Sequence, residues 1–297
     1  MADFIYHVTT EDEGREVREI MRDNFTFSAR LRNRIKRNKL VRRNGEMTEG
    51  WHKVAAGDVI EIVLPEERSN FEPENIPLFP VYEDGDILLL NKQPGLVVHP
   101  TKGNPTGTVA NALMYRMEET GEHFKVRFVN RLDRDTSGIL IVAKNAFSQN
   151  EITKQMKADE TEKRYVAIVE GIMEEDTGTI DAPIGRPDPD DVRRGVMEGG
   201  HPSVTHYKVI ERFTESGFTY VELRLETGRT HQIRVHMSYM GHPVLSDHLY
   251  GTERPAIIER QALHASSLSF NHPGTGERLT VTAPIPEDMK KALSLFR

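Results

Sequence analysis

The sequence FVNRLDRDTSGILIVAKN, residues 128–145, holds the most informative pattern in this chain. Two apolar stretches flank a cluster of charged and hydroxyl side chains that an ordinary hydrophobic core would not contain. The short β-branched run after Gly138 predicts an interior strand. In an extended segment Arg131 and Asp133 would project from one face and Leu132 from the other. The pattern therefore predicts a guanidinium and a carboxylate presented together beside buried strands.

A solvated turn is the simplest alternative for this cluster, because charged residues between strands usually face water. The alternation of arginine and aspartate over residues 131–135 weighs against that alternative. A guanidinium and a carboxylate that project together from one face favour a functional site at this stretch. Both interpretations remain open on this stretch alone.

Length and composition limit the classes of protein to which the chain can belong. It has 297 residues, a formal net charge of −7 and no cysteine. This length can bury the core of one large domain and a small one. Without cysteine, chemistry must come from carboxylates, histidines, tyrosines, arginines or a bound cofactor. Because no apolar run reaches a membrane span and no signal-peptide pattern opens the chain, we expect a cytoplasmic protein that contacts no membrane.

Basic residues are concentrated in residues 30–43, RLRNRIKRNKLVRR, which contain no acidic residue. Leu31 and Ile35 lie at helical spacing, which predicts a helix with a basic face followed by a turn. A solvated helix face is the alternative, but such faces usually mix both signs of charge. We therefore favour contact with RNA phosphates. The candidate RNA-binding residues are Arg30, Arg32, Arg34, Lys36, Arg37, Lys39, Arg42 and Arg43.

Residues 65–80, PEERSNFEPENIPLFP, are rich in proline and acid and lack periodicity, which is typical of a stiff linker. This predicts a small domain over residues 1–64 and a larger one over residues 81–297. In the small domain we expect a helix within 15–27, the basic helix, a tight turn at Asn44-Gly45 and a strand within 54–64.

The larger region alternates strand and helix patterns. Expected elements are a strand at 87–91, helices at 108–117 and 146–159, strands at 162–171 and 221–226, a helix ending at Gly241, a strand at 279–284 and a last helix after Pro286. The glycine- and proline-rich residues 185–202 read as a loop. Thr227-Gly228-Arg229 would be a strand-to-helix turn that presents Arg229 at the start of the helix.

Histidines near this helix suggest a zinc site, which the spacing disfavours. His231 and His236 are five residues apart, so in a helix they point to different faces. We therefore expect no metal.

Three motifs in order resemble those of the RluA-type pseudouridine synthases. They are NRLDRDTSG at 130–138, in which Asn130 stands where the family usually has histidine, KRYVA at 163–167 and GRTHQIRVH at 228–236. Further likeness lies in KQPGLVVHP at 92–100, DHLYG at 247–251 and ALHASSLSF at 262–270. Residues 1–64 resemble, more weakly, the alpha-L RNA-binding domain.

The resemblance implies that the protein isomerises uridine to pseudouridine in RNA. Asp133 would be the nucleophile, attacking the sugar or the base or assisting formation of a glycal. Tyr165, which by its strand position alone would be read as core, would stack on the detached base and could take its C5 proton. Arg229 would pair with Asp133 and keep it ionised, and Arg131 would fill the space left by the flipped uridine. Further candidate substrate-binding residues are Asn130, Arg134, Thr136, His231, Gln232 and Leu263.

The implied fold is α/β, with a large mixed, mainly antiparallel sheet flanked by helices around a central cleft, plus the small N-terminal α/β domain. The reaction has no redox step and no external group, so no cofactor is expected. We expect a monomer acting on large-subunit ribosomal RNA. Alternatives are transfer RNA as the substrate, a non-catalytic ribosome assembly factor, and a glycosidase, which would need a second carboxylate that the motifs do not offer.

Overall fold

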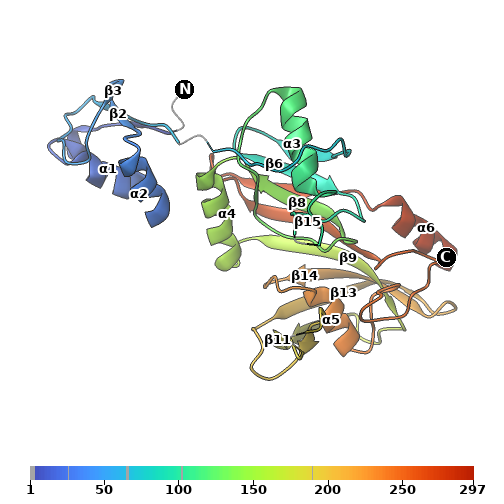
Figure 1. The fold of residues 1–297 in the computed structure, drawn as a ribbon. Coiled ribbons are helices and arrows are strands. Elements are labelled where there is room, and N and C mark those ends of the chain that lie inside the picture. The colour runs from blue at the N-terminus through green and yellow to red at the C-terminus, as the bar shows by residue number, and fades with distance from the viewer. Residues whose placement is uncertain (1–3, 26, 65–66, 102, 189) are drawn as a thin grey trace.

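The computed structural model describes residues 4–25, 27–64, 67–101, 103–188 and 190–297, and these form a small N-terminal part beside a large sheet (Figure 1). The N-terminal part contains a four-stranded antiparallel sheet in the order β1-β4-β2-β3. Its elements are β1 (Phe4–His7), a short 3-10 helix (Thr10–Asp12), α1 (Val17–Asn24), α2 (Ala29–Arg37), β2 (Val41–Arg43), β3 (Glu46–Met47) and β4 (Val59–Ile62).

Local sequence signals account for the elements of the N-terminal part. Helix α2 begins after Ser28, whose hydroxyl accepts a hydrogen bond from the backbone N–H of Leu31 at 3.2 Å. Leu31 and Ile35 are buried on one face of the helix, as their spacing predicts. The Asn44-Gly45 turn between β2 and β3 is confirmed, and both of its residues have positive φ. The expected helix, turn and strand pattern is therefore confirmed over the described residues, which exclude Thr26.

The larger part is built on a ten-stranded sheet in the order β10-β13-β14-β9-β15-β8-β6-β5, with β16 paired to β15 and β7 to β8. Among the described strands β8 and β15 pair in parallel, and the other pairings are antiparallel. The mixed, mainly antiparallel sheet is thus confirmed. Its strands are β5 (Pro80–Glu83), β6 (Ile87–Lys92), β7 (Arg127–Phe128), β8 (Ser137–Ala143), β9 (Glu162–Glu170), β10 (Thr177–Asp181), β13 (Val204–Phe213), β14 (Phe218–Leu225), β15 (Leu263–Asn271) and β16 (Arg278–Thr282).

Helices cover both faces of this sheet. The alternating side chains of β6 place Leu88 and Leu90 in one core with α3, and Ile87 and Leu89 in another with α4. Helix α5 packs on the β9–β14 end of the sheet, and α6 shares that core. The helices are α3 (Val109–Thr120), α4 (Ala146–Lys157), α5 (Gln232–Tyr239) and α6 (Glu287–Phe296). None of the helices in the described ranges is both long and apolar enough to cross a membrane.

The loop expected at 185–202 contains a two-stranded hairpin of β11 (Ile184–Gly185) and β12 (Gly195–Val196). In Figure 1 this hairpin lies next to α5, below the large sheet. Pro189 lies outside the described residues.

Residues 67–79 carry no helix or strand, yet they lie against the larger part of the molecule. Phe71, Ile76 and Leu78 pack on the α3 core, and the hydroxyl of buried Ser69 accepts a hydrogen bond from the Val126 N–H at 3.0 Å. Residues 65–66 of the expected linker lie outside the described ranges. We keep the division into residues 1–64, 65–80 and 81–297 as a proposal, with residues 67–79 attached to the larger part.

Candidate active site

The cluster quoted from residues 128–145 forms a loop between β7 and β8. Leu132 is buried in the α3 core, and Arg131, Leu132 and Asp133 all line a cavity at this loop. A bend precedes Arg131 and a turn follows Asp133, and the predicted separation of these side chains onto two faces is not seen, because Leu132 lines the cavity as well. Gly138, with φ of 111°, begins β8 where the strand approaches β15, and a Cβ there would overlap the Ala265 carbonyl.

Asp133 is held by an arginine from helix α5. Nη1 of Arg234 lies 3.1 Å from Oδ2 of Asp133. The same guanidinium binds Asp247 in a bidentate manner, with Nε to Oδ2 at 2.6 Å and Nη2 to Oδ1 at 2.7 Å. Burial alone would lower the pKa of Arg234, but Asp247 and Asp133 raise it above its ordinary value. A buried, always charged guanidinium therefore stands between a fully buried carboxylate and Asp133.

The prediction that Arg229 pairs with Asp133 is wrong. Arg229 is exposed, lies before α5 begins, and donates from Nε to the Pro202 carbonyl oxygen at 3.2 Å. Arg234 is the third residue of the helix and points into the core side of α5. Sequence reasoning placed the functional arginine in the exposed turn, because an arginine between Ile233 and Val235 gives no sign of its buried partners. Arg229 still lines the cavity that contains Asp133.

His231 and Tyr250 continue the network around the carboxylate. Nε2 of His231 lies 3.9 Å from Oδ1 of Asp133, and its Nδ1 is 2.9 Å from the Tyr250 hydroxyl. Burial lowers the pKa of His231 despite the opposing charge of Asp133. The Tyr250 oxygen also accepts a hydrogen bond from the Arg194 N–H at 2.7 Å, and its ring lies 5.2 Å from the Arg234 guanidinium carbon. Tyr250 thus connects the β11–β12 hairpin to the active-site loop.

Tyr165 on β9 faces the same cavity as Asp133. Burial, followed by the charge of Asp133, raises the pKa of Tyr165 to about 12. The phenol is therefore protonated at neutral pH. The cavity has a volume of about 60 Å³, and Thr136 and Leu263 also line it. The structure thus brings together seven of the predicted residues from three distant segments, residues 131–136, 165 and 229–232, with Leu263 beside them.

Two of the predicted substrate-binding amides are already used by the protein. Asn130 donates to the Ile139 carbonyl oxygen at 3.0 Å and accepts from the Ile141 N–H at 2.8 Å, so it braces β8, and it is absent from the described lining of the cavity. The carboxamide of Gln232 accepts from Thr227 Oγ1 and the Arg229 N–H, and it donates to the Val204 carbonyl oxygen and Thr205 Oγ1. Both side chains therefore organise the site. The assignment of Asn130 to substrate contact is corrected, whereas Gln232 lines the cavity and its contact with substrate stays a prediction.

Arg134 does not line the cavity either, among the residues described around it. Its exposed side chain donates from Nε to the Gly95 carbonyl oxygen at 3.3 Å. Its own carbonyl oxygen accepts a hydrogen bond from buried Lys92 at 2.8 Å, which anchors the active-site loop. Burial lowers the pKa of Lys92 to about 7.

Sequence reasoning missed four residues of this site. The signals that pointed to them were the stretches KQPGLVVHP and DHLYG, which were noted without roles, and the second arginine of the 228–236 motif. The residues are Lys92, Arg234, Asp247 and Tyr250.

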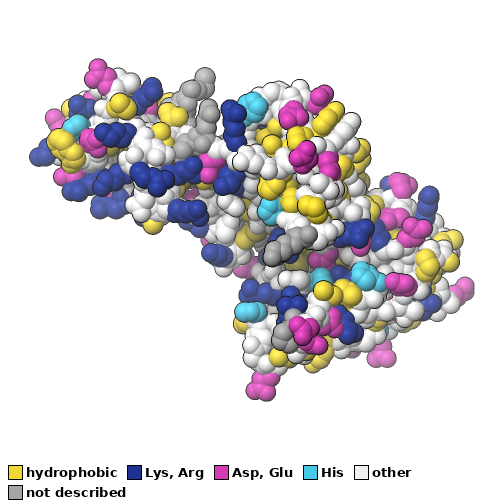
Figure 2. Space-filling model, in the orientation of Figure 1, with side chains coloured by type: hydrophobic (Ala, Val, Ile, Leu, Met, Phe, Trp, Pro, Cys, Tyr) yellow, Lys and Arg dark blue, Asp and Glu magenta, His cyan; other side chains and the backbone are white. Residues whose placement is uncertain are grey.

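The basic residues of 30–43 are distributed over different faces of the N-terminal part. Figure 2 shows Lys and Arg side chains gathered along its lower edge. Arg30, Arg34 and Arg37 line a hollow on one face of α2. Others are engaged within this part: Arg32 donates to the Phe27 carbonyl oxygen at 2.5 Å, Lys39 lies 3.4 Å from Glu49, and Arg43 donates to the Lys53 carbonyl oxygen at 2.7 Å.

Comparison with known proteins agrees with this geometry. The family model described as RNA pseudouridylate synthase matches residues 86–239, just over half of the chain. "Uncharacterized RNA pseudouridine synthase YlyB" of Bacillus subtilis (strain 168) is 43% identical over 86% of this chain and 84% of its own length. "Ribosomal large subunit pseudouridine synthase D" of Haemophilus ducreyi is 41% identical over 90% of this chain and 86% of its own.

A solved structure shows the same fold. "Human RNA Pseudouridylate Synthase Domain Containing 1" superposes with a TM-score of 0.59 at 31% identity, covering 70% of this chain and 83% of the human one. The site contains a carboxylate held by a buried arginine and a tyrosine in the same cavity. This geometry is consistent with the similarities to known proteins. The chain belongs to the RNA pseudouridylate synthase family, enzymes that isomerise uridine in RNA.

Proposed function

We propose that this protein converts specific uridines of large-subunit ribosomal RNA to pseudouridine, with Asp133 as the essential carboxylate. One observation carries the assignment of the site: Asp133 lies 3.1 Å from buried Arg234 in a cavity that Tyr165 and Arg131 also line. Relatives named ribosomal large subunit pseudouridine synthase D, about 41% identical over most of the chain, support this class of RNA. We further propose that the protein acts as a cytoplasmic monomer.

The isomerisation conserves every atom of the nucleotide. The bond between N1 of uracil and C1′ of ribose breaks, the detached base rotates, and C5 bonds to C1′. The proton on C5 then leaves and N1 gains one, so no oxidant, reductant or group donor is consumed. The requirement is a charge that assists cleavage at C1′ and walls that retain the free base.

Asp133 supplies that charge in the proposed mechanism. The guanidinium of Arg234 donates a hydrogen bond to the Asp133 carboxylate, an arrangement that suits a nucleophile. The bidentate bond to Asp247 fixes the guanidinium, so an N–H of its Nη1 holds Asp133 in place. Asp133 would attack the sugar or the base or assist glycal formation.

Tyr165 would form one wall of the base pocket. Its aromatic ring offers a surface on which the detached uracil stacks, and its protonated phenol offers a hydrogen-bond donor. With a pKa of about 12, the phenol would accept the C5 proton only after it had given up its own. We therefore place stacking first among its roles.

Arg131 would enter the space left by the flipped uridine. It is exposed and borders the cavity of Asp133. Extruding a stacked nucleotide costs a few kcal/mol, and a side chain that replaces the base recovers part of that cost. Arg229, exposed at the rim of the same cavity, would contact RNA instead of pairing with Asp133.

Replacement of Asp133 tests this function directly. We expect Asp133→Asn to form no detectable pseudouridine in single-turnover assays while RNA affinity stays near normal, because the shape remains and the charge is lost. Asp135→Asn is the matched control: Asp135 lies in the same loop, outside the described lining of the cavity, and it should cause a much milder loss. Substantial turnover by Asp133→Asn, or equal damage at both aspartates, would overturn the assignment.

Mapping of pseudouridine identifies the RNA. We expect sites in large-subunit ribosomal RNA that are present in cells with the wild-type protein and absent in cells that carry Asp133→Asn. New sites confined to transfer RNA would contradict the proposed substrate. Unchanged pseudouridine in all RNA would favour a non-catalytic assembly role.

A further inference from the structure

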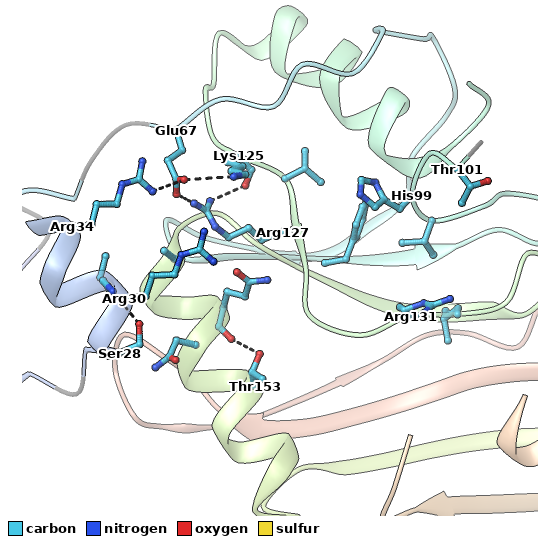
Figure 3. Close-up of a pocket in the computed structure, with 18 of the residues that line it drawn as sticks. Ser28, Arg30, Arg34, Glu67, His99, Thr101, Lys125, Arg127, Arg131 and Thr153 are labelled. Carbon is cyan, nitrogen blue, oxygen red and sulfur yellow. Dashed lines mark hydrogen bonds and ion pairs between the residues drawn. The ribbon is translucent and has the colours of Figure 1, made fainter. Parts of the chain in front are cut away.

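A second hollow of about 870 Å³ opens between α2 and α4 (Figure 3). Ser28, Arg30 and Arg34 of the N-terminal part line one side, and Gln149 and Thr153 of α4 line another. We call this hollow the α2–α4 groove. Arg131 and Leu132 line both the groove and the cavity of Asp133, so the two spaces adjoin at the active-site loop.

The groove is strongly cationic. Its described lining contains five cationic side chains, from Arg30, Arg34, Lys125, Arg127 and Arg131, and one acidic side chain. The protein as a whole is acidic, with a net charge of −7, so this concentration of positive charge is local. Such a groove favours a polyanion that follows its length.

The single acidic residue, Glu67, lies among the cations. Its carboxylate is 2.5 Å from Nη1 of Arg34 and 3.6 Å from Nζ of Lys125, and it also pairs with Arg127. Figure 3 shows the three side chains converging on it from two parts of the molecule. The Glu67 side chain is 13% exposed and that of Arg127 is 8% exposed.

The buried guanidinium requires a counter-charge. Burial lowers the pKa of Arg127 to about 10, so the group is still charged at neutral pH. A buried charge without a partner is costly. In the free protein Glu67 supplies that partner. A phosphate presents the same kind of oxygen pair to a guanidinium as a carboxylate does, and arginine binds both groups.

We propose that the α2–α4 groove binds the RNA backbone that continues from the flipped uridine, and that the Glu67 carboxylate occupies the place that an RNA phosphate takes in the complex. Arg131 stands at the junction, so a strand whose uridine enters the Asp133 cavity passes its neighbouring nucleotides directly into the groove. Glu67 then lowers affinity for polyanions in general, because any RNA must displace it. This inference rests on the proposed function for the identity of the substrate RNA.

The affinity for a 15-nucleotide oligouridylate, measured at several salt concentrations, tests the groove without knowledge of the natural target. Arg30→Gln and Arg34→Gln should each weaken binding about five-fold or more. Each should also reduce the slope of log affinity against log salt by about 0.7, the value for one phosphate contact on a single strand. Lys157→Gln is the matched control, since it removes one charge from α4, on the other side of the groove, at an exposed position outside the described lining. Equal losses from all three variants, or none, would overturn the proposal.

Glu67→Gln gives the opposite and more specific result. Removing the internal carboxylate should tighten oligouridylate binding about three- to ten-fold and steepen the salt slope, because the cations are released for phosphate. A folded Glu67→Gln protein with unchanged or weaker binding would contradict the displacement of Glu67. If this variant does not fold, Glu67→Asp, with a carboxylate one methylene shorter, should show the same direction more weakly, and unchanged binding there would contradict the idea.

The failure of this inference is separable from failure of the proposed function. If wild-type protein forms no pseudouridine in ribosomal RNA, the function is wrong, and the oligouridylate slopes still report on the groove. If the wild type is active and the groove variants bind and turn over normally, only the groove is wrong.

Discussion

Arg234 binds two carboxylates that have different roles in the enzyme. Asp247 takes two of its N–H groups and fixes the guanidinium, while Asp133 takes a third and faces the cavity. A planar guanidinium can bind one carboxylate through two N–H groups and still donate to another, whereas a lysine ammonium lacks this planar fork. The geometry of one side chain therefore determines both the position of Asp133 and the neutralisation of buried Asp247.

Arg234→Lys should retain the charge and lose the function. We expect turnover to fall at least about 100-fold, which corresponds to about 3 kcal/mol at the transition state. Stability should also fall by about 3 kcal/mol, because Asp247 loses its bidentate partner. Single-turnover rates and urea unfolding measure the two effects. Arg229→Lys, at the exposed turn, should change either quantity little, and a larger loss there than at Arg234 would contradict the pairing.

The parallel contact of β8 with β15 is the element-scale feature that supports the active-site loop. Ser137 and Gly138 open β8 immediately after the loop and pair with His264 and Ala265. Nδ1 of His264 is 2.9 Å from the Ser137 hydroxyl, and Nε2 is 3.3 Å from the Ala283 carbonyl oxygen. A disturbance of this contact would reach Asp133 through only a few residues of chain.

Gly138→Ala should disturb the contact between β8 and β15 directly. The residue has φ of 111°, and a Cβ would overlap the backbone of Ala265, which cannot move aside without breaking the pairing. We expect a loss of about 3 kcal/mol or more in the free energy of unfolding and a loss of turnover. Gly85→Ala is the control, because a Cβ there meets nothing within 4 Å. Comparable stability of the two variants in urea would show that the contact between β8 and β15 can accommodate a Cβ at residue 138.

His264 should make the stability of this contact depend on pH. Burial lowers its pKa to about 4, below the ordinary value of 6.5. Between pH 6.5 and pH 4 the unfolded chain therefore binds more protons at this histidine than the folded protein does. The free energy of unfolding should fall as the pH falls through this window, by roughly 3 kcal/mol at most.

Urea unfolding at pH 7 and pH 4.5 measures this dependence. His264→Gln should lose part of the pH-dependent difference, whereas His248→Gln, at an exposed position, should retain it. Identical pH dependence in wild type and His264→Gln would show that other groups account for acid destabilisation.

At the scale of the whole molecule, the N-terminal part is attached through aromatic packing. Phe147 of α4 belongs to the core of the N-terminal part, with ring centroids 4.7 Å from Phe4 and 5.8 Å from Phe27. This contact places α2 opposite α4 and so forms the groove between them. Residues 1–64 therefore contribute a wall of the binding surface in addition to their own basic side chains.

Phe147→Ala should loosen this attachment. We expect a larger radius of gyration in small-angle scattering, faster proteolysis between the two parts, and weaker RNA binding with a flatter salt slope. Turnover at saturating RNA should be largely retained, because Asp133, Arg234 and Tyr165 belong to the larger part. Phe79→Ala, at an exposed phenylalanine, is the control. Unchanged scattering with unchanged RNA binding would contradict the role of Phe147.

Much of this protein could be predicted from sequence because the relevant interactions are local. The spacing of Leu31 and Ile35 in α2, the turn at Asn44-Gly45 and the buried run of β8 depend on residues a few positions apart, and each prediction is confirmed. The predicted alternation around Leu132 is confirmed only in part, because Leu132 belongs to the α3 core but also lines the cavity that contains Asp133. The reaction class followed from motifs that retain these residues in order.

Only the tertiary structure decided which arginine serves Asp133. Arg229 and Arg234 lie in the same motif, and their roles differ because α5 begins at Gln232 and turns its third residue toward Asp247 and a loop 101 positions away. The ion pairs of Glu67 could not be predicted either, since their three cations come from α2, from Lys125 and from Arg127 at the start of β7. Ion pairs between distant segments depend on how helices and strands pack, and no local pattern encodes that packing.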